Sequence, residues 1–340
     1  MTRRNCPALR HGLRVACLIP VLLSPAVAAG PVPPRPVHTY SIVARDPDTG
    51  QLGVAVQSHW FSVGPLVPWA EAGVGAVATQ SFVRVDYGPE GLALMKRGVP
   101  APEALRRLLE ADEARAVRQV AMIDARGRVA AHTGARCIRA AGHRIGKDYS
   151  VQANLMLDSG VWPAMAGAFE SAKGDLAERM LAALEAAEAA GGDIRGRQSA
   201  ALLVVRGKSS GKPWNDTVVE LRIEDHPEPL KEMRRLLNLW RAYEHMNAGD
   251  LAVERDDIDA AAGHYGAAEA MVPDMDEFVF WHAAALAKAG RLEESLPLFR
   301  KAFLMRPAWA LLVPRLPDSD LLPDDREAIG RILALGPAAE

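Results

Sequence analysis

The sequence has no excess of charge of either sign, few aromatic residues and no long hydrophobic run, and each of these shortages excludes a class of protein. Its 340 residues contain 40 basic and 42 acidic side chains, a net charge of -2, which provides no field for nucleic acid or an anionic membrane. Aromatic residues make up only 6% and are not interleaved with basic ones, as a nucleic-acid groove requires. The longest apolar stretch of the N-terminal region, residues 15–23, is too short to span a bilayer.

That apolar stretch instead indicates a removable signal peptide over residues 1–29. Four arginines precede it, and Ala26-Val-Ala28 resembles a signal-peptidase site, so we expect cleavage after Ala28 or Ala29. Residues 30–37 (GPVPPRPV) would then form a Pro-rich, extended leader. The expected location is the bacterial periplasm or the medium, with no membrane contact after cleavage.

Cysteine is also scarce. Of three cysteines, Cys6 and Cys17 lie in the signal peptide, so the exported chain would keep only Cys137. This excludes an internal disulfide and a metal site built on thiolates. We expect Cys137 to be buried as a small apolar residue, whereas an exposed thiol would allow a cross-linked dimer.

Residues 38–228 alternate between groups of strands and pairs of helices. Thr39–Arg45 and Leu52–Gln57 are rich in β-branched residues and flank the turn sequence Asp46-Pro-Asp-Thr-Gly50, which predicts a hairpin. The order of strands, two helices, strands, two helices and strands predicts an α+β fold with sheets between helical layers. The predicted strands cover 39–45, 52–57, 73–80, 118–123, 128–133, 149–156, 199–206 and 217–223, and the predicted helices cover 87–97, 102–113, 162–172 and 176–190.

Residues 229–340 are predicted to be an all-α domain with an internal repeat. Four residues recur at a spacing of 34, the tetratricopeptide period, and they are Ile258, Tyr265, Ala268 and Pro273, followed by Leu292, Phe299, Ala302 and Pro307. The first helices of the two repeats are predicted at residues 240–255 and 276–288, with a closing segment at 311–332. An antiparallel helical bundle is the alternative interpretation.

Common catalytic motifs are missing, and the sequence predicts neither a metal nor a cofactor. Its nine histidines show no H-E-x-x-H spacing, and the chain has no G-x-S-x-G elbow and no phosphate loop. A serine mechanism would have to pair Ser58 or Ser199 with a histidine that the sequence cannot identify. The segment Asp193-Ile-Arg-Gly-Arg-Gln-Ser199 is dense in hydrogen-bonding groups, so it forms either a structural network or the wall of a polar site.

Several sequence blocks resemble the family called domain of unknown function 1028, over about residues 39–237. The blocks are TYSIVARDPDTGQLGVAVQS, GVGAVATQSF, RQVAMIDARGRVAAHTG, the strand of Asn154, AGGDIRGRQSAALLVV and LRIEDHPEP. That family is similar to the N-terminal nucleophile (Ntn) hydrolases, which implies a four-layer αββα sandwich. A helical C-terminal extension in this family is described as a peptidoglycan-binding region, and residues 229–340 resemble it.

The resemblance also implies a chemistry. In Ntn hydrolases the first residue attacks an amide carbonyl and its own α-amine is the base. The matching residue here is Thr39, with Asp46, Asn154 and Asp193 at positions of accompanying catalytic groups. We further predict that seven polar side chains line the binding site, namely Ser58, Thr79, Gln80, Arg118, Arg195, Gln198 and Ser199.

Two departures from that pattern leave two functions open. No lysine follows the second strand, where Gln57-Ser58-His59 stands, and Thr39 is N-terminal only if the bond from His38 is cut. One hypothesis is therefore an exported amide or peptide hydrolase that uses Thr39. The other is a non-catalytic Ntn-like domain that binds peptide or cell-wall fragments, with the helical repeats as a protein adaptor. Assembly into a homo-oligomer through the helical layers is compatible with both.

Overall fold

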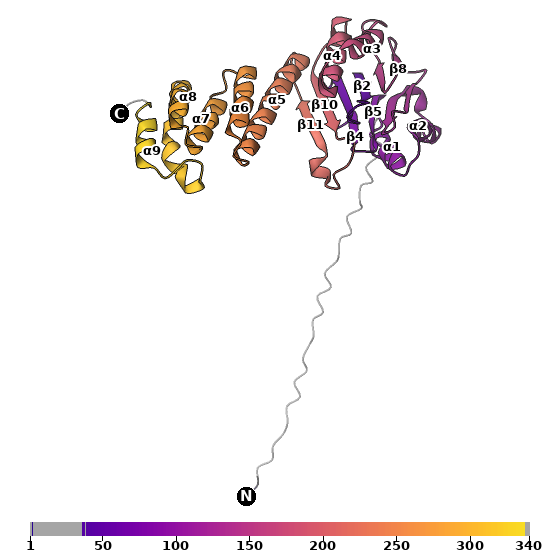
Figure 1. Cartoon of the computed structure of the whole chain (residues 1–340). Helices are drawn as coiled ribbons and strands as arrows, with labels where there is room; N and C mark the ends of the chain where they lie inside the picture. The colour runs from indigo at the N-terminus through magenta and orange to yellow at the C-terminus, as the bar shows by residue number, and fades with distance from the viewer. Residues whose placement is uncertain (1, 3–35, 38, 337–340) are drawn as a thin grey trace. The chain divides into compact units, whose positions relative to one another are not determined.

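The computed structural model describes Thr2, residues 36–37 and residues 39–336. The expected signal peptide, apart from Thr2, lies outside the described residues, as do most of the leader and His38. Two antiparallel sheets and two helix pairs precede residue 229, and the chain beyond it is nearly all helical (Figure 1). The predicted mixed fold with antiparallel sheets, followed by a helical region, is therefore confirmed.

The six-stranded sheet has the order β11-β10-β3-β2-β9-β8, with every neighbouring pair antiparallel. Its hairpin is the predicted one, because Gly50 at φ 72° closes the turn after Asp46, in a conformation that favours glycine. The strands are β2 (Thr39–Arg45), β3 (Leu52–Ser58), β8 (Gly142–Gly146), β9 (Tyr149–Ala153), β10 (Ser199–Val205) and β11 (Thr217–Ile223).

The five-stranded sheet is built around β5 and β6. Along one side of β5 lie two short strands, β4 and β1, and β1 pairs Val37 with Ser81. Because only residue 38 separates β1 from β2, the chain passes here from one sheet to the other. The strands are β1 (Pro36–Val37), β4 (Pro68–Glu71), β5 (Gly75–Phe82), β6 (Arg118–Asp124) and β7 (Val129–Thr133).

Three hydrophobic clusters hold these elements together. The first joins the facing sides of the two sheets, for example through Val54 and Ile123. The second joins the other side of the six-stranded sheet to α3 (Val161–Ser171) and α4 (Leu176–Ala189). The third joins the other side of the five-stranded sheet to α1 (Tyr87–Lys96) and α2 (Ala101–Glu110). Alternating apolar side chains on the strands supply both faces of each sheet.

Besides the two-residue β1, two strands were not predicted from the sequence, for physical reasons. Strand β8 carries glycine at both ends and only half-buried or exposed side chains, so it shows no apolar alternation. Strand β4 begins with Pro68, and proline is tolerated at the start of a strand that pairs on one side only. Both lie at sheet edges, where burial imposes the weakest pattern on a sequence.

The spacing of 34 residues found in the sequence of the helical region also separates two of its helices. Helices α6 (Ile258–Met271) and α8 (Leu292–Met305) begin and end 34 residues apart, and Tyr265 and Phe299 are buried at equivalent positions. Helix α7 (Asp276–Lys288) matches its predicted bounds. The helix predicted at 240–255 is wrong at its start, because α5 (Pro229–Val253) is continuous from Pro229. Short 3-10 turns (Pro307–Leu311, Val313–Arg315 and Pro317–Ser319) and α9 (Arg326–Leu333) make up the end.

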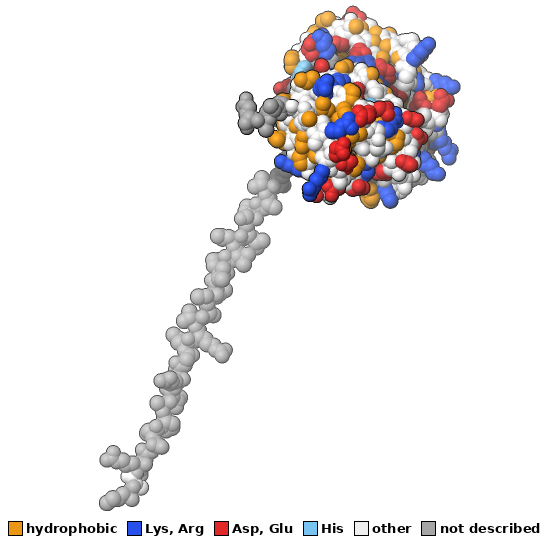
Figure 2. Space-filling model, turned by 60° about the vertical axis from the view of Figure 1, so that its left-hand side comes forward, with side chains coloured by type: hydrophobic (Ala, Val, Ile, Leu, Met, Phe, Trp, Pro, Cys, Tyr) orange, Lys and Arg blue, Asp and Glu red, His pale blue; other side chains and the backbone are white. Residues whose placement is uncertain are grey.

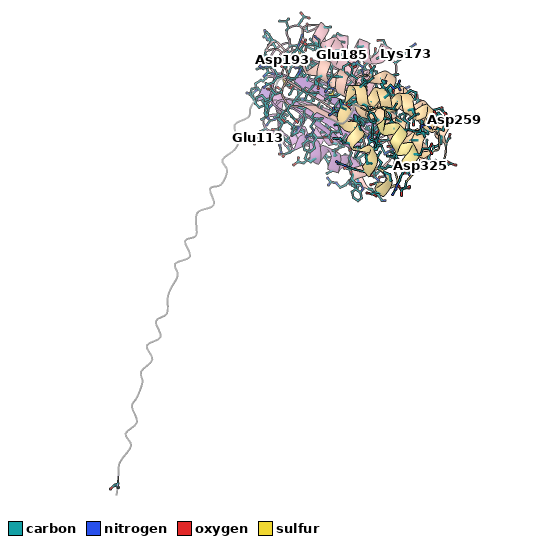
Figure 3. The ribbon with its side chains drawn as sticks, turned by 90° about the vertical axis from the view of Figure 1, so that its left-hand side faces the viewer. Glu113, Lys173, Glu185, Asp193, Asp259 and Asp325 are labelled. Atoms are coloured by element: carbon teal, nitrogen blue, oxygen red, sulfur yellow. The ribbon has the colours of Figure 1, made fainter. Side chains whose placement is uncertain are left out.

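Helix α5 is joined to α4 by an ionic cluster centred on Glu178. This carboxylate accepts hydrogen bonds from Arg234 and, at 2.9 Å, from Arg241, while Arg234 also reaches Glu185, which Figure 3 labels. Burial would raise the pKa of Glu178, but the two guanidinium groups lower it overall. The cluster links the first helix of the helical region to the sheet-bearing part of the chain.

We expect Glu178→Gln to lower the free energy of unfolding by about 1 kcal/mol at neutral pH, since the pair is partly exposed. A depressed pKa contributes stability above the unfolded value, about 4.3 for Glu, and that contribution is lost as the pH falls through the lower folded pKa. Urea unfolding at several pH values should therefore show the difference shrink as the pH falls below about 4.3. Glu113→Gln, on an exposed side chain, is the control and should show no such pH-dependent loss.

Cys137 is only 8% exposed, and its thiol donates to the carbonyl oxygen of Arg118 at 3.3 Å. Burial raises the pKa of this thiol. We expect alkylation of Cys137 by iodoacetamide to be at least about tenfold slower in the folded protein than in urea, because the thiolate is the nucleophile. Peptide mapping of the time course measures this, and equal rates in both states would contradict a buried thiol.

On the face shown in Figure 2, basic and acidic side chains are interspersed, without a field of one sign. Among the helices that the structure describes, none is long and apolar enough to cross a membrane.

Candidate functional site

Thr39 is the first residue of β2, next to the centre of the six-stranded sheet, and its exposure is 0%. Its hydroxyl donates a hydrogen bond of 3.0 Å to the hydroxyl of Ser58, its register partner at the end of β3. Residues of one strand alternate between faces, so Thr39 shares the face of Val43, which lies against the second sheet. The hydroxyl of Thr39 therefore sits at the end of the interface between the two sheets.

The carbonyl group of Thr39 is held as firmly as its hydroxyl. Its oxygen accepts from the backbone N–H of Asn154 at 3.1 Å and from the Nε2 of Gln80 at 3.1 Å, with Asn154 Nδ2 at 3.4 Å. Gln80 comes from the opposite sheet and Asn154 directly follows β9. Two chain segments thus fix the backbone at this residue.

A buried polar network extends from this point between the sheets. Gln119 on β6 receives hydrogen bonds at its Oε1 from Gln80 at 2.7 Å and from Asn154 at 2.8 Å. Gln80 in turn accepts from Ser41 at 2.6 Å, and Ser41 accepts from Gln152 at 2.6 Å. All five side chains have 0% exposure. Such fully paired networks rigidify a core, since an unpaired buried amide is costly.

Residues on either side of Ser58 carry buried polar atoms for which the described chain offers no hydrogen-bond partner. These are both amide atoms of Gln57 and the Nδ1 of His59. Unsatisfied buried groups are rare in native proteins and typically have a functional reason or a bound water. These unpaired atoms therefore make the end of β3 a candidate contact point for a ligand or an ordered water.

The segment 193–199 lies at the same end of the six-stranded sheet, because Ser199 is the register partner of Ser58. Asp193 is buried, accepts from the backbone of His59 at 3.4 Å, and forms an ion pair of 2.6 Å with Arg195. Both hydroxyl contacts of Ser199 are to the loop after β3, at Trp60 and Val63. A shallow cavity of about 440 Å³ opens beside this segment, lined in part by Leu157, Asp193 and Arg197.

Three predicted binding residues do not join this group. Thr79 donates to the carbonyl oxygen of Arg84 at 3.1 Å, and Arg118 pairs with Asp112 at 2.8 Å. Each lies one position from an inter-sheet residue, Gln80 or Gln119, and therefore on the opposite face of its strand. Gln198 is partly exposed and donates to Asp225 at 3.2 Å.

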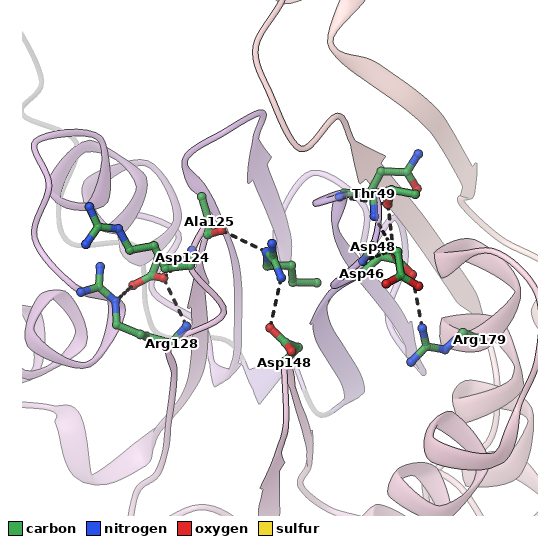
Figure 4. Close-up of polar contacts among 11 residues, drawn as sticks. Asp46, Asp48, Thr49, Asp124, Ala125, Arg128, Asp148 and Arg179 are labelled. Atoms are coloured by element: carbon green, nitrogen blue, oxygen red, sulfur yellow. Dashed lines mark hydrogen bonds and ion pairs between the residues drawn. The ribbon is translucent and has the colours of Figure 1, made fainter.

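Asp46 is likewise separated from Thr39. It follows the last residue of β2, about 23 Å from Thr39 at about 3.3 Å per residue. Its carboxylate accepts from the backbone of Asp48 at 3.1 Å and of Thr49 at 2.8 Å, and pairs with Arg179 at 3.4 Å (Figure 4). Burial would raise the pKa of Asp46, but these contacts lower it. The structure therefore places Asp46 in the turn after β2, away from Thr39.

The backbone around Thr39 is strained at two non-glycine residues. Ser81, opposite β1, has φ 70°, and Leu155, next to Asn154, has φ 59°. Left-handed conformations of such residues cost about 1–3 kcal/mol and cluster at functional sites. Both lie within one residue of a side chain that contacts the carbonyl of Thr39.

Comparison with known families decides the relationship of this chain. The family of unknown function DUF1028 matches residues 39–233. The chain belongs to this family. A crystal structure of protein SPO2555 from Silicibacter pomeroyi, described as DUF1028, is 32% identical, covering 59% of this chain and 88% of that chain with a TM-score of 0.53. No curated protein matches the chain.

The DUF1028 match includes Thr39, Gln80, Gln119, Asn154 and the segment 193–199, and it ends near the start of α5. The whole candidate site thus belongs to the DUF1028 region. The helical region from α6 onward lies beyond it.

Sequence reasoning missed Ser41, Gln119 and Gln152 of the DUF1028 site. The available signal was a polar residue every second position in strands whose other positions are apolar, as in Thr39-x-Ser41 and Gln152-x-Asn154. Facing strands from two sheets bring these positions together, and that pairing is not a local property of the sequence.

No metal site is indicated by the geometry of the described residues. In that part of the chain no group of three or more His, Cys, Asp or Glu side chains could hold a metal ion. The amides around the Thr39 carbonyl are used within the protein and hold the backbone of Thr39 in place, with its hydroxyl at the end of the space between the sheets.

Proposed function

We propose that the DUF1028 domain is a four-layer αββα sandwich of the Ntn-hydrolase type and that it hydrolyses an amide or peptide bond with Thr39. The layering is supported by the three hydrophobic clusters, which place helices outside each of two facing sheets. The single observation that carries the activity is the position of Thr39, a hydroxyl residue that starts a central strand and is bound at both its hydroxyl and its carbonyl.

In the proposed reaction the Thr39 oxygen attacks the substrate carbonyl carbon and its proton passes to the α-amine of Thr39. The tetrahedral intermediate then collapses to an ester on Thr39, and the departing amine takes that proton. Water hydrolyses the ester and restores the hydroxyl. Ser58, 3.0 Å away, would orient the attacking oxygen.

This chemistry requires that the bond between His38 and Thr39 be cut, because an amide nitrogen in a peptide bond is not a base. The cut would also detach β1, whose two residues pair with Phe82 and Ser81 of β5. The protein is then a latent enzyme until its leader has been removed. We include export to the periplasm or medium in this proposal, on the basis of the signal-peptide pattern of residues 1–29.

The second candidate function is binding without catalysis. It is favoured by the pairing of β1 with β5, which makes the leader a part of the sheet. A domain that keeps its leader would use the polar end of the sheets to bind a peptide, an amide or a cell-wall fragment. In both versions the helices from α5 onward form a tetratricopeptide-like adaptor, and the helical layers are available for a homo-oligomer.

N-terminal sequencing and intact mass of the exported protein separate the two candidates. We expect the mature chain to begin at Thr39. If all material begins at residue 29 or 30, the free-threonine mechanism is wrong and the binding function remains.

A further inference from the structure

A groove between α5 and α7 is distinct from the site at Thr39. It encloses a cavity of about 560 Å³, within the range of pockets that bind ligands. Tyr243 and Asp250 of α5 and Glu254, next to its end, form one wall, and Glu277 and Trp281 of α7 form the other. Figure 1 shows α5, α6 and α7 side by side.

The charge of the groove is negative. Its lining contains three carboxylates, those of Asp250, Glu254 and Glu277, against one ammonium, that of Lys288. Lys288 is paired with Asp320, which does not line the cavity. The groove therefore carries an excess of two negative charges and would favour a cation.

Two of the carboxylates are held by tyrosine hydroxyls. Tyr243 donates to Glu277 at 3.0 Å and Tyr265 donates to Asp250 at 2.7 Å, and each bond uses one carboxylate oxygen. Burial and the neighbouring carboxylate raise the pKa of both tyrosines, so they act as donors at neutral pH. The acidic groups are thus pre-positioned along the groove.

Aromatic rings supply the rest of the surface. Tyr243 packs edge-on against Phe278 with ring centroids 5.0 Å apart, and Trp281 lies on the same helix as Phe278. Aromatic rings beside carboxylates recognise guanidinium and ammonium groups through cation–π attraction and ion pairing.

The groove is longer than a single cationic group requires. Its lining runs from Tyr243 to Glu254 on one side and from Glu277 to Lys288 on the other. Eleven residues of helix rise about 16 Å, which matches about five residues of extended chain. Resting on the adaptor role proposed above for these helices, we propose that the groove binds an extended peptide segment through an Arg or Lys side chain.

Fluorescence anisotropy with the full chain tests this proposal. The probes are a fluorescein-labelled, C-terminally amidated pentapeptide Ala-Ala-Arg-Ala-Ala and the same peptide with Gln in place of Arg. We expect the Arg peptide to bind at least about tenfold more tightly, and its binding to weaken as salt screens the carboxylates.

Glu277→Gln should weaken binding of the Arg peptide about tenfold. Glu244→Gln is the matched control, because Glu244 is exposed on α5 and does not line the groove. Thermal unfolding of both variants should match the parent, which separates binding from folding. No binding at about 1 mM peptide, equal binding of the Gln peptide, or an equal loss in Glu244→Gln would each overturn the proposal. Displacement of the peptide by an equal concentration of tetramethylammonium would also overturn it, since a small cation would then suffice.

Discussion

Replacing Thr39 by alanine is expected to lower the rate of amide hydrolysis by the processed protein by at least about 10³-fold, because the residue supplies the attacking oxygen. The fold should survive, because the threonine side chain is small. The substitution removes the hydrogen bond of 3.0 Å between the Thr39 hydroxyl and Ser58. We expect a cost of about 1–2 kcal/mol in the free energy of unfolding. Loss of activity without loss of structure is the signature of a nucleophile.

The measurement does not require knowledge of the substrate. A β-lactone acylates a nucleophilic hydroxyl by ring opening, so the processed protein should gain the mass of one probe, on the peptide that begins with Thr39. A specific protease site placed before residue 39 makes the cut independent of Thr39 itself. Thr39→Ser should keep labelling and Thr39→Ala should lose it.

Thr79→Ala is the matched control, because Thr79 is also a buried threonine but bonds to the carbonyl oxygen of Arg84 on the opposite face of β5, outside the site. It should be labelled like the parent protein. Labelling of Thr39→Ala, or labelling of the parent at another hydroxyl such as Ser199, would show that Thr39 is not the nucleophile.

Replacing Gln119 by alanine is expected to cause the largest loss of stability among the polar residues of the site. Its Nε2 lies 2.9 Å from Thr133, 3.1 Å from the Gly142 carbonyl and 2.8 Å from the Ala153 carbonyl, and its Oε1 accepts from Gln80 and Asn154. Alanine would leave these partners buried and unpaired, at about 1–3 kcal/mol for each group that finds no other partner.

We therefore expect the free energy of unfolding to fall by about 3–4 kcal/mol, and the melting temperature by about 6–15 °C. Urea unfolding followed by circular dichroism measures the change. Gln198→Ala is the control, because its partly exposed amide makes a hydrogen bond of 3.2 Å to Asp225, and it should change stability by less than about 0.5 kcal/mol. Equal effects of the two substitutions would mean that the inter-sheet network does not stabilise the fold.

Local sequence patterns predicted the hairpin of the site but not which polar side chains lie close together. The hairpin of Thr39 and Ser58 could be predicted because β-branched residues and a Pro-Asp-Thr-Gly turn are local signals. Asp46 was expected among the catalytic groups from the family resemblance, but a strand of seven residues separates it from the hydroxyl end of β2 at Thr39. Arg118 was predicted to line the site, but its neighbour Gln119 makes the contacts with Gln80 and Asn154. A shift of one position moves a side chain to the other face of the sheet.

The sequence by itself determined the antiparallel hairpins, the helix pairs, the helical C-terminal region and the membership in DUF1028, because each depends on periodicity or on matched blocks of neighbouring residues. Only the tertiary structure decided which polar side chains surround Thr39. Gln80 reaches it across the space between two sheets and Asn154 reaches it from the end of β9, while Gln119 holds both of these side chains. Contacts between residues 35 to 115 positions apart are set by how whole sheets pack, and no local pattern specifies them.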